Sequence, residues 1–312
     1  MRPLKAEDIY GNWATLLLPV SLSEAIDYGQ LKEELDILIE ARPNGIYSNG
    51  TAGEFYTLNE KEFDKVSELL AQKCERAHIP FQIGVSHASP QIALGRLKRV
   101  IALKPGALQA ILPDWSPVSL AEAEIFLQKL AAEAEDIGLI LYNPPHAKKV
   151  LKPAEWAVLK KAVPSLVGVK VFDHNGDDDW YAEARKYGEG LSVFVPGHNL
   201  ATGISKGAQG AYSNVACLNP FAAQRWYAMM ETDLESALEI EQRIQKFLAD
   251  YITPYITKKN FSNQAVDKLL AAIGGWAPIT SRLRWPYRWI SKSEVDDLRP
   301  IAQKALPEFF TR

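Results

Sequence analysis

Short apolar runs rich in β-branched residues alternate with longer amphipathic segments over roughly the first 217 residues of the chain. Segments between the runs, such as 58–77 and 119–138, place apolar residues at the helical period and charged residues on the other face. The repeating unit is therefore a strand followed by a helix, which predicts parallel strands. The expected strands lie within residues 13–20, 45–50, 81–86, 108–114, 138–143, 166–171, 191–197 and 210–216.

Eight such units in about 220 residues predict a (β/α)8 TIM barrel rather than a doubly wound sheet. Neither a GxGxxG nor a GxxxxGK[ST] phosphate turn occurs in the sequence. After residue 220 the strand pattern stops, and helical patterns follow at 221–230, 234–252, 263–275 and 293–306. We expect a catalytic barrel domain over residues 1–219 and a helical region over 220–312 that packs on it, because no Ser/Gly linker separates them.

The composition indicates what kind of partner the protein has. Of 312 residues, 47% are hydrophobic and 23% charged, and the formal net charge of -3 gives no electrostatic basis for binding nucleic acid or an anionic membrane surface. The first 20 residues lack the pattern of a signal peptide, and no apolar run approaches the roughly 18 residues of a membrane span. Two isolated cysteines, Cys74 and Cys217, fit free thiols of a reducing compartment. We therefore expect a cytoplasmic protein that acts on a small molecule.

One lysine interrupts an expected buried strand. Lys170 in "LVGVKV" alternates with Val169 and Val171, so the period of a strand points it into the barrel. One interpretation is a buried ion pair with a carboxylate such as Glu54 or Asp173. The other is a desolvated amine whose lowered pKa lets it form a Schiff base with a carbonyl substrate.

Polar residues gather at the expected carboxyl ends of the strands, where barrels of this kind carry their active sites. Tyr142 ends the strand before that of Lys170, which suits it to exchange the proton that carbinolamine formation needs. The turn "NGTAGE" follows the second strand, and its backbone N–H groups suit a carboxylate. A tyrosine that only packs and an ordinary turn capped by Thr51 are the structural alternatives. Further candidate substrate contacts at these ends are Trp115, His146, Gly197, His198 and Tyr212.

Several motifs in a fixed order resemble the dihydrodipicolinate synthase / N-acetylneuraminate lyase family of pyruvate-type class I aldolases. They are "GTAGE", "LYNPP", "GVKVF", "VPGHN", "GAYSNVA" and the late "SRLRWPYRWIS", which together cover nearly the whole chain. The resemblance implies a barrel with a C-terminal helical region and a homo-oligomer, a tetramer or a dimer. It also implies that Lys170 forms the Schiff base and that Tyr142 shuttles the proton. The implied carboxylate-binding turn is Gly50, Thr51 and Ala52.

Three positions depart from the family members that make dihydrodipicolinate. Ala52 stands where a second hydroxyl residue is usual, and Trp115 lies near the place of a relay tyrosine. Ala147 lies near the place of an arginine that binds the carboxylate of the second substrate. These changes argue against a role in lysine biosynthesis but leave Lys170 and Tyr142 for imine chemistry.

The leading hypothesis is a class I lyase that forms an imine with a 2-oxo acid, such as pyruvate or a sugar-derived 2-keto acid. It then makes or breaks a carbon–carbon bond, with an aldehyde as the expected partner and with neither cofactor nor metal. One alternative is a keto-deoxy-sugar-acid dehydratase, which "GEFYTL" also resembles, and another is a family member that binds a ligand without turnover. A metal-dependent hydrolase that uses histidines at the strand ends is the last alternative, although neither HxH nor HExxH occurs.

Overall fold

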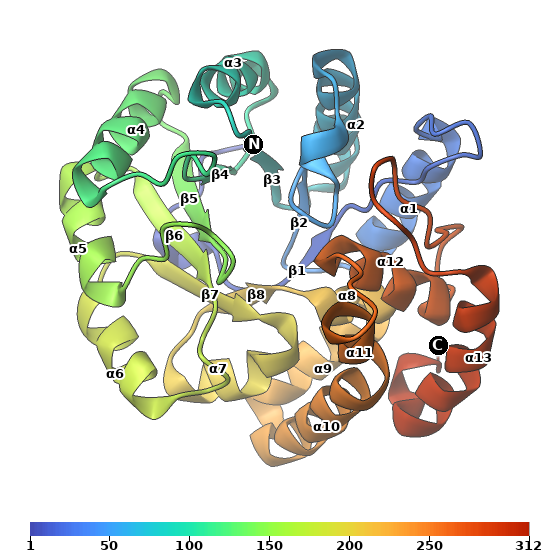
Figure 1. The fold of residues 1–312 in the computed structure, drawn as a ribbon. Helices are drawn as coiled ribbons and strands as arrows, with labels where there is room; N and C mark the ends of the chain where they lie inside the picture. The colour runs from blue at the N-terminus through green and yellow to red at the C-terminus, as the bar shows by residue number, and fades with distance from the viewer. Residues whose placement is uncertain (312) are drawn as a thin grey trace.

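The computed structural model describes residues 1–311 and contains a closed barrel of parallel strands (Figure 1). Each strand pairs with the next along the chain, and the last pairs with the first. Every observed strand overlaps an expected one, which confirms the predicted TIM barrel. The strands are β1 (Gly11–Thr15), β2 (Gly45–Ser48), β3 (Phe81–Gly84), β4 (Ala107–Ile111), β5 (Gly138–Asn143), β6 (Leu166–Val171), β7 (Ser192–Pro196) and β8 (Gly210–Tyr212).

Helices follow the strands and form the outer layer of the barrel (Figure 1). They are α1 (Tyr28–Glu40), α2 (Glu60–Ala77), α3 (Pro90–Val100), α4 (Leu120–Glu133), α5 (Pro153–Ala162), α6 (Asp178–Tyr187) and α7 (Leu200–Lys206). Shorter 3-10 turns are η1 (Ala6–Asp8), η2 (Phe55–Thr57), η3 (Ile101–Leu103) and η4 (Gly197–Asn199).

The expected eighth strand is shorter than its apolar pattern suggests. After Tyr212 the chain turns into a short helix, α8 (Asn214–Leu218), and does not continue as a strand to residue 216. Ser213 causes the change because its side chain accepts a hydrogen bond from the backbone N–H of Ala216 and so caps the helix. Cys217 therefore lies in a helix and not at a strand end.

The rest of the chain is helical and lies on one side of the barrel, in orange and red in Figure 1. Within residues 213–311 no strand occurs, and α9 begins at Pro220, where we expect the helical region to begin. Every helix in residues 1–311 is too short or too polar to span a bilayer. The elements are α9 (Pro220–Thr232), α10 (Leu234–Phe247), the π-helical turn η5 (Leu248–Ile252), α11 (Thr253–Thr257), α12 (Asn263–Gly274), α13 (Lys292–Ala305) and η6 (Pro307–Phe309).

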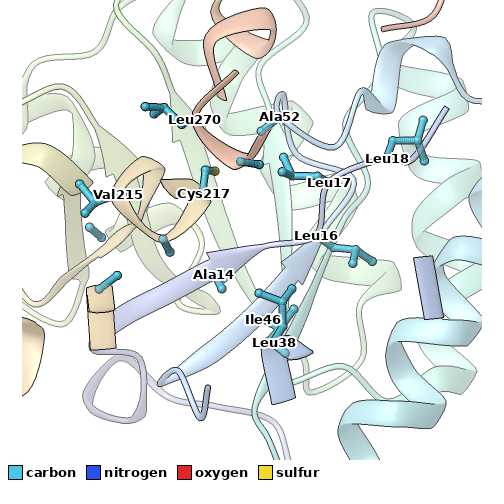
Figure 2. Packing of buried hydrophobic residues seen from close by; sticks show 14 of the residues in the cluster. Ala14, Leu16, Leu17, Leu18, Leu38, Ile46, Ala52, Val215, Cys217 and Leu270 are labelled. Atoms are coloured by element: carbon cyan, nitrogen blue, oxygen red, sulfur yellow. The ribbon is translucent and has the colours of Figure 1, made fainter. Parts of the chain in front are cut away.

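One hydrophobic cluster joins these helices to the barrel. Figure 2 shows Ala14 of β1 and the following Leu16 in the same cluster as Val215 of α8 and Leu270 of α12. A second cluster fills the barrel interior, where Trp13 meets ring edges of its neighbours. Because these side chains fill the barrel interior, a substrate site is expected not inside the barrel but at the carboxyl ends of the strands.

Candidate active site

Lys170 points into the barrel, as its place in the strand predicts. Its Nζ lies 4.2 Å from the ring centroid of Tyr142, the residue opposite it in the β5–β6 register. The rings of Tyr47 on β2 and Tyr212 on β8 lie 5.1 and 5.2 Å from the same nitrogen. A long hydrogen bond of 3.4 Å runs from Nζ to the Tyr47 hydroxyl. Three tyrosine rings thus surround the amine, while the Lys170 residue as a whole stays partly exposed toward the cavity.

This environment changes the protonation of both groups. Burial lowers the pKa of Lys170 to about 8, although the nearby charge of Asp267 raises it in part. Burial raises the pKa of Tyr142 to about 12, and interaction with the Thr51 side chain offsets part of that increase. At pH 7 about a tenth of Lys170 is then the neutral amine, which is the nucleophilic form. Tyr142 keeps its proton and can donate it.

The interpretation of Lys170 as half of an ion pair with Glu54 or Asp173 is wrong. Glu54 pairs instead with Lys268, whose Nζ lies 2.5 Å from Glu54 Oε1. Asp173 accepts a hydrogen bond of 3.0 Å from the Tyr181 hydroxyl. In residues 1–311 neither carboxylate pairs with Lys170, so these two structural roles do not account for the lysine.

A cavity of about 280 Å³ lies around Lys170 at the carboxyl ends of the strands. Its walls come from these strand ends and from α8, η5, α11 and α12 of the C-terminal part. Seven of the ten predicted site residues line it, which are Lys170, Tyr142, Thr51, Ala52, Gly197, His198 and Tyr212. The chain therefore brings most of the candidates to one place, while the role of each stays a prediction.

The other three predicted site residues do not line this cavity. Gly50 lies buried behind it, where a Cβ would come within 2.5 Å of the Tyr47 ring, so glycine lets the turn approach that tyrosine. Trp115 is 87% exposed and lines a separate surface groove with Ile125. His146 is exposed. Substrate contacts by these three residues stay predictions.

The histidines lie apart from one another. His198 is held by Asn214, whose side chain lies within hydrogen-bond distance of its Nδ1, and burial lowers its pKa. His87 accepts a hydrogen bond from the backbone of Ser89, and His174 is exposed. No three His, Cys, Asp or Glu side chains in residues 1–311 form a group that could hold a metal ion. The arrangement that the hydrolase alternative needs is therefore not found in the described chain.

Asp267 lines the cavity as well, although it was not among the residues expected there from the sequence. Asn263, Val266, Asp267 and Leu270 of α12 line the cavity, at the spacing of one helical face. Burial raises the pKa of Asp267 to about 6, while the charge of Lys170 lowers it. The sequence does contain a sign of this residue, because Asp267 interrupts an apolar stripe of the helix. Burying a carboxylate at such a position costs free energy unless the charge is paired or used.

A buried ion pair holds α12 against the turn after β2. Both side chains of Glu54 and Lys268 are fully buried, and Lys268 also donates hydrogen bonds to the carbonyl oxygens of Leu18 and Arg282. Glu54 itself has a left-handed backbone with φ of 52° at the end of this turn. The pair fixes Asp267, the neighbour of Lys268, relative to the "GTAGE" turn.

Comparison with known proteins agrees with this architecture. A prophage protein of E. coli K12 that belongs to the dihydrodipicolinic acid synthase family, YagE, solved in complex with pyruvate, superposes with a TM-score of 0.83. It is 17% identical, and the match covers 95% of this chain and 98% of that one. At 17% identity this similarity shows that the two proteins share a fold and shows nothing more.

Curated relatives are similar at low identity. The trans-O-hydroxybenzylidenepyruvate hydratase-aldolase of Pseudomonas putida is 26% identical over 61% of this chain and 64% of its own length. The chain thus spans less than two thirds of that relative. The 4-hydroxy-tetrahydrodipicolinate synthase of Pseudomonas putida strain W619 is 25% identical over 95% of this chain and 98% of its own.

These names are those of lyases of the predicted type, which agrees with the prediction of a carbon–carbon or carbon–oxygen lyase. The sequence matches the dihydrodipicolinate synthetase family over residues 9–305, almost its full length. That range includes the barrel, the cavity around Lys170 and the helices that follow. The chain therefore belongs to the dihydrodipicolinate synthetase family.

Proposed function

We propose that the protein is a class I lyase that forms an imine between Lys170 and a 2-oxo acid such as pyruvate. The observation that carries the proposal is the enclosed amine of Lys170, which has a pKa of about 8 and faces Tyr142 inside the cavity. A buried lysine with a lowered pKa is the group that Schiff-base catalysis needs. Membership of the family supports the same reaction type.

The residues suit each step of imine formation. The neutral Lys170 amine attacks the C2 carbonyl carbon, and the oxygen takes up a proton from Tyr142 to give a carbinolamine. Tyr142 takes a proton back from the nitrogen and passes it to this hydroxyl, which leaves as water, so that the protonated imine forms and Tyr142 is left as the phenolate. The protonated imine accepts the electron pair of the C3–C4 bond, which breaks as the Tyr142 phenolate takes the proton of the C4 hydroxyl. The products are an aldehyde and an enamine, whose C3 takes up the proton from Tyr142 before water hydrolyses the resulting imine to pyruvate and free Lys170.

The turn after β2 supplies the site for the substrate carboxylate. Thr51 and Ala52 line the cavity beside Tyr142, so an oxo acid bound to Lys170 would reach them. Among the hydrogen bonds of residues 1–311, none has the backbone N–H of Thr51 or Ala52 as its donor. These backbone N–H groups are therefore free to bind an anion, even without a hydroxyl at residue 52.

Part of the cavity lining is apolar, which supports cleavage of a larger 2-oxo acid rather than dehydration of a small, polyhydroxylated sugar acid. Leu248 and Ile252 of η5 and Ile256 of α11 present an apolar surface there. Such a surface suits an aldehyde fragment with an apolar body. The name of the hydratase-aldolase relative indicates a substrate of that kind for the relative, which supports this choice.

Intact mass spectrometry after borohydride reduction tests the proposal. The protein incubated with pyruvate should gain the mass of one reduced adduct per chain. Lys170→Ala should gain none, whereas Lys148→Ala, which removes an exposed lysine whose Nζ donates to the carbonyl of Trp115, should react like the wild type. Labelling that survives Lys170→Ala would refute the role of Lys170. If no 2-oxo acid labels the wild type, the protein is a binder without imine chemistry.

A further inference from the structure

The charges that line the cavity are few. Within the described residues, Lys170 and Asp267 are the only cavity-lining side chains that are charged at neutral pH, and no arginine is among them. Asp267 is 9% exposed, and no ion pair joins it to Lys170 in residues 1–311. In the proposed reaction the lysine becomes a protonated imine that keeps one positive charge, and the substrate's own carboxylate and Asp267 already supply two negative charges. The carboxylate of Asp267 faces the same space and has no part in the steps derived above.

No other cation is placed to balance a second negative charge there. His198 lines the cavity, but burial lowers its pKa, so it is neutral at pH 7. Lys268 follows Asp267 on α12 but is buried against Glu54 and donates to the carbonyl of Leu18. The Lys268 ammonium is therefore engaged with Glu54 and does not line the cavity.

The position of Asp267 indicates which part of a substrate it meets. Thr51 and Ala52 hold the carboxylate end of the oxo acid in the proposed function, and Lys170 holds C2. Asp267 belongs to another wall, formed by α12 together with apolar residues such as Val266 and Leu270. With C1 held at the Thr51–Ala52 turn and C2 at Lys170, the part of the substrate beyond C2 extends into the rest of the cavity, whose lining includes Asp267.

We propose that Asp267 determines substrate specificity by selecting 2-oxo acids whose far end is uncharged and carries a hydroxyl group. The hydroxyl donates a hydrogen bond to the Asp267 carboxylate, and a second carboxylate at that end is repelled by it. This inference rests on the proposed imine chemistry. An unpaired buried carboxylate is costly unless a donor satisfies it, and like charges in an enclosed site disfavour each other strongly.

Trapping with three five-carbon acids tests this inference. The probes are 2-oxopentanoate, 5-hydroxy-2-oxopentanoate and 2-oxoglutarate, which differ only at the far end. In the wild type we expect 2-oxoglutarate to be trapped at least about 10-fold more slowly than 2-oxopentanoate, a difference of about 1.4 kcal/mol. The hydroxylated acid should be trapped at least as fast as 2-oxopentanoate.

Asp267→Asn should reduce the 10-fold gap between 2-oxoglutarate and 2-oxopentanoate to about 2-fold or less, because the amide carries no charge. The variant also changes the pKa of Lys170, but that effect is common to all three acids and cancels in the ratio. Asp297→Asn is the matched control, since it removes an exposed carboxylate on α13, and it should keep the wild-type ratio.

Each outcome decides a separate question. A wild type that traps all three acids at similar rates would overturn the inference without any variant, as would an unchanged gap in Asp267→Asn. Trapping of the acids with the expected ratios supports it. Failure of the wild type to trap any acid, pyruvate included, would overturn the proposed function and this inference with it.

Discussion

The link between Asp267 and Lys170 predicts how one substitution changes the pH dependence of imine formation. Asp267 carries a negative charge that raises the pKa of Lys170, against the larger lowering by burial. Asp267→Asn removes this charge and keeps the shape of the side chain. The pKa of Lys170 should therefore fall, and the loss of a nearby opposite charge accounts for on the order of one pKa unit.

The size of the effect follows from the fraction of neutral amine. With a pKa of about 8, roughly 9% of Lys170 is neutral at pH 7, and with a pKa near 7 about 50% is neutral. Trapping at pH 7 should thus become about fivefold faster in Asp267→Asn. Above pH 9 both proteins are almost fully deprotonated at this lysine, and the rates should converge.

The assay is the initial rate of pyruvate labelling from pH 6 to pH 10, expressed relative to Asp297→Asn at each pH so that the pH dependence of the reductant cancels. Thermal unfolding of each variant shows whether the fold is intact. The predicted effect of Asp267 on the pKa of Lys170 is refuted if the pH–rate profile of Asp267→Asn coincides with that of Asp297→Asn, or if it moves to higher pH.

Three further predictions follow from the site and its support. Tyr142→Phe should slow imine formation by about 10²-fold or more because the proton donor is lost, while the Kd for pyruvate, measured by calorimetry, changes little. Glu54→Gln should lower the free energy of unfolding by about 3–5 kcal/mol in urea titrations, because Lys268 is left buried without its counter-charge. A double variant with Glu54→Leu and Lys268→Met should recover part of this stability, because it removes both buried charges. Gly197→Ala should lower both stability and pyruvate labelling, because the new Cβ would lie 2.7 Å from Ser213 Cα; a variant that labels at the wild-type rate would contradict the packing seen here.

The barrel could be predicted because its strands are buried and short, and each is followed by a helix with a clear polar face. The exception is the segment after Tyr212, where the side chain of Ser213 starts a helix inside an apolar run. A local cap outweighs the strand preference of the residues around it. The periodicity alone carries no information about such a hydrogen bond.

The candidate site was predictable where it depends on strand ends, and not where it depends on the C-terminal helices. Lys170 and Tyr142 lie on neighbouring strands, so topology brings them together. Asp267 comes from a helix 97 positions later in the chain, and only the packing of α12 places it in the cavity. The partner of Glu54 was missed for the same reason, because Lys268 lies on that helix.

The most direct test of the account is peptide mapping of the wild-type protein after borohydride reduction in the presence of pyruvate. We predict a single modified peptide, with the reduced adduct on Nζ of Lys170. An adduct on another lysine, or an unmodified protein under conditions where a known class I aldolase is fully labelled, would contradict the central claim.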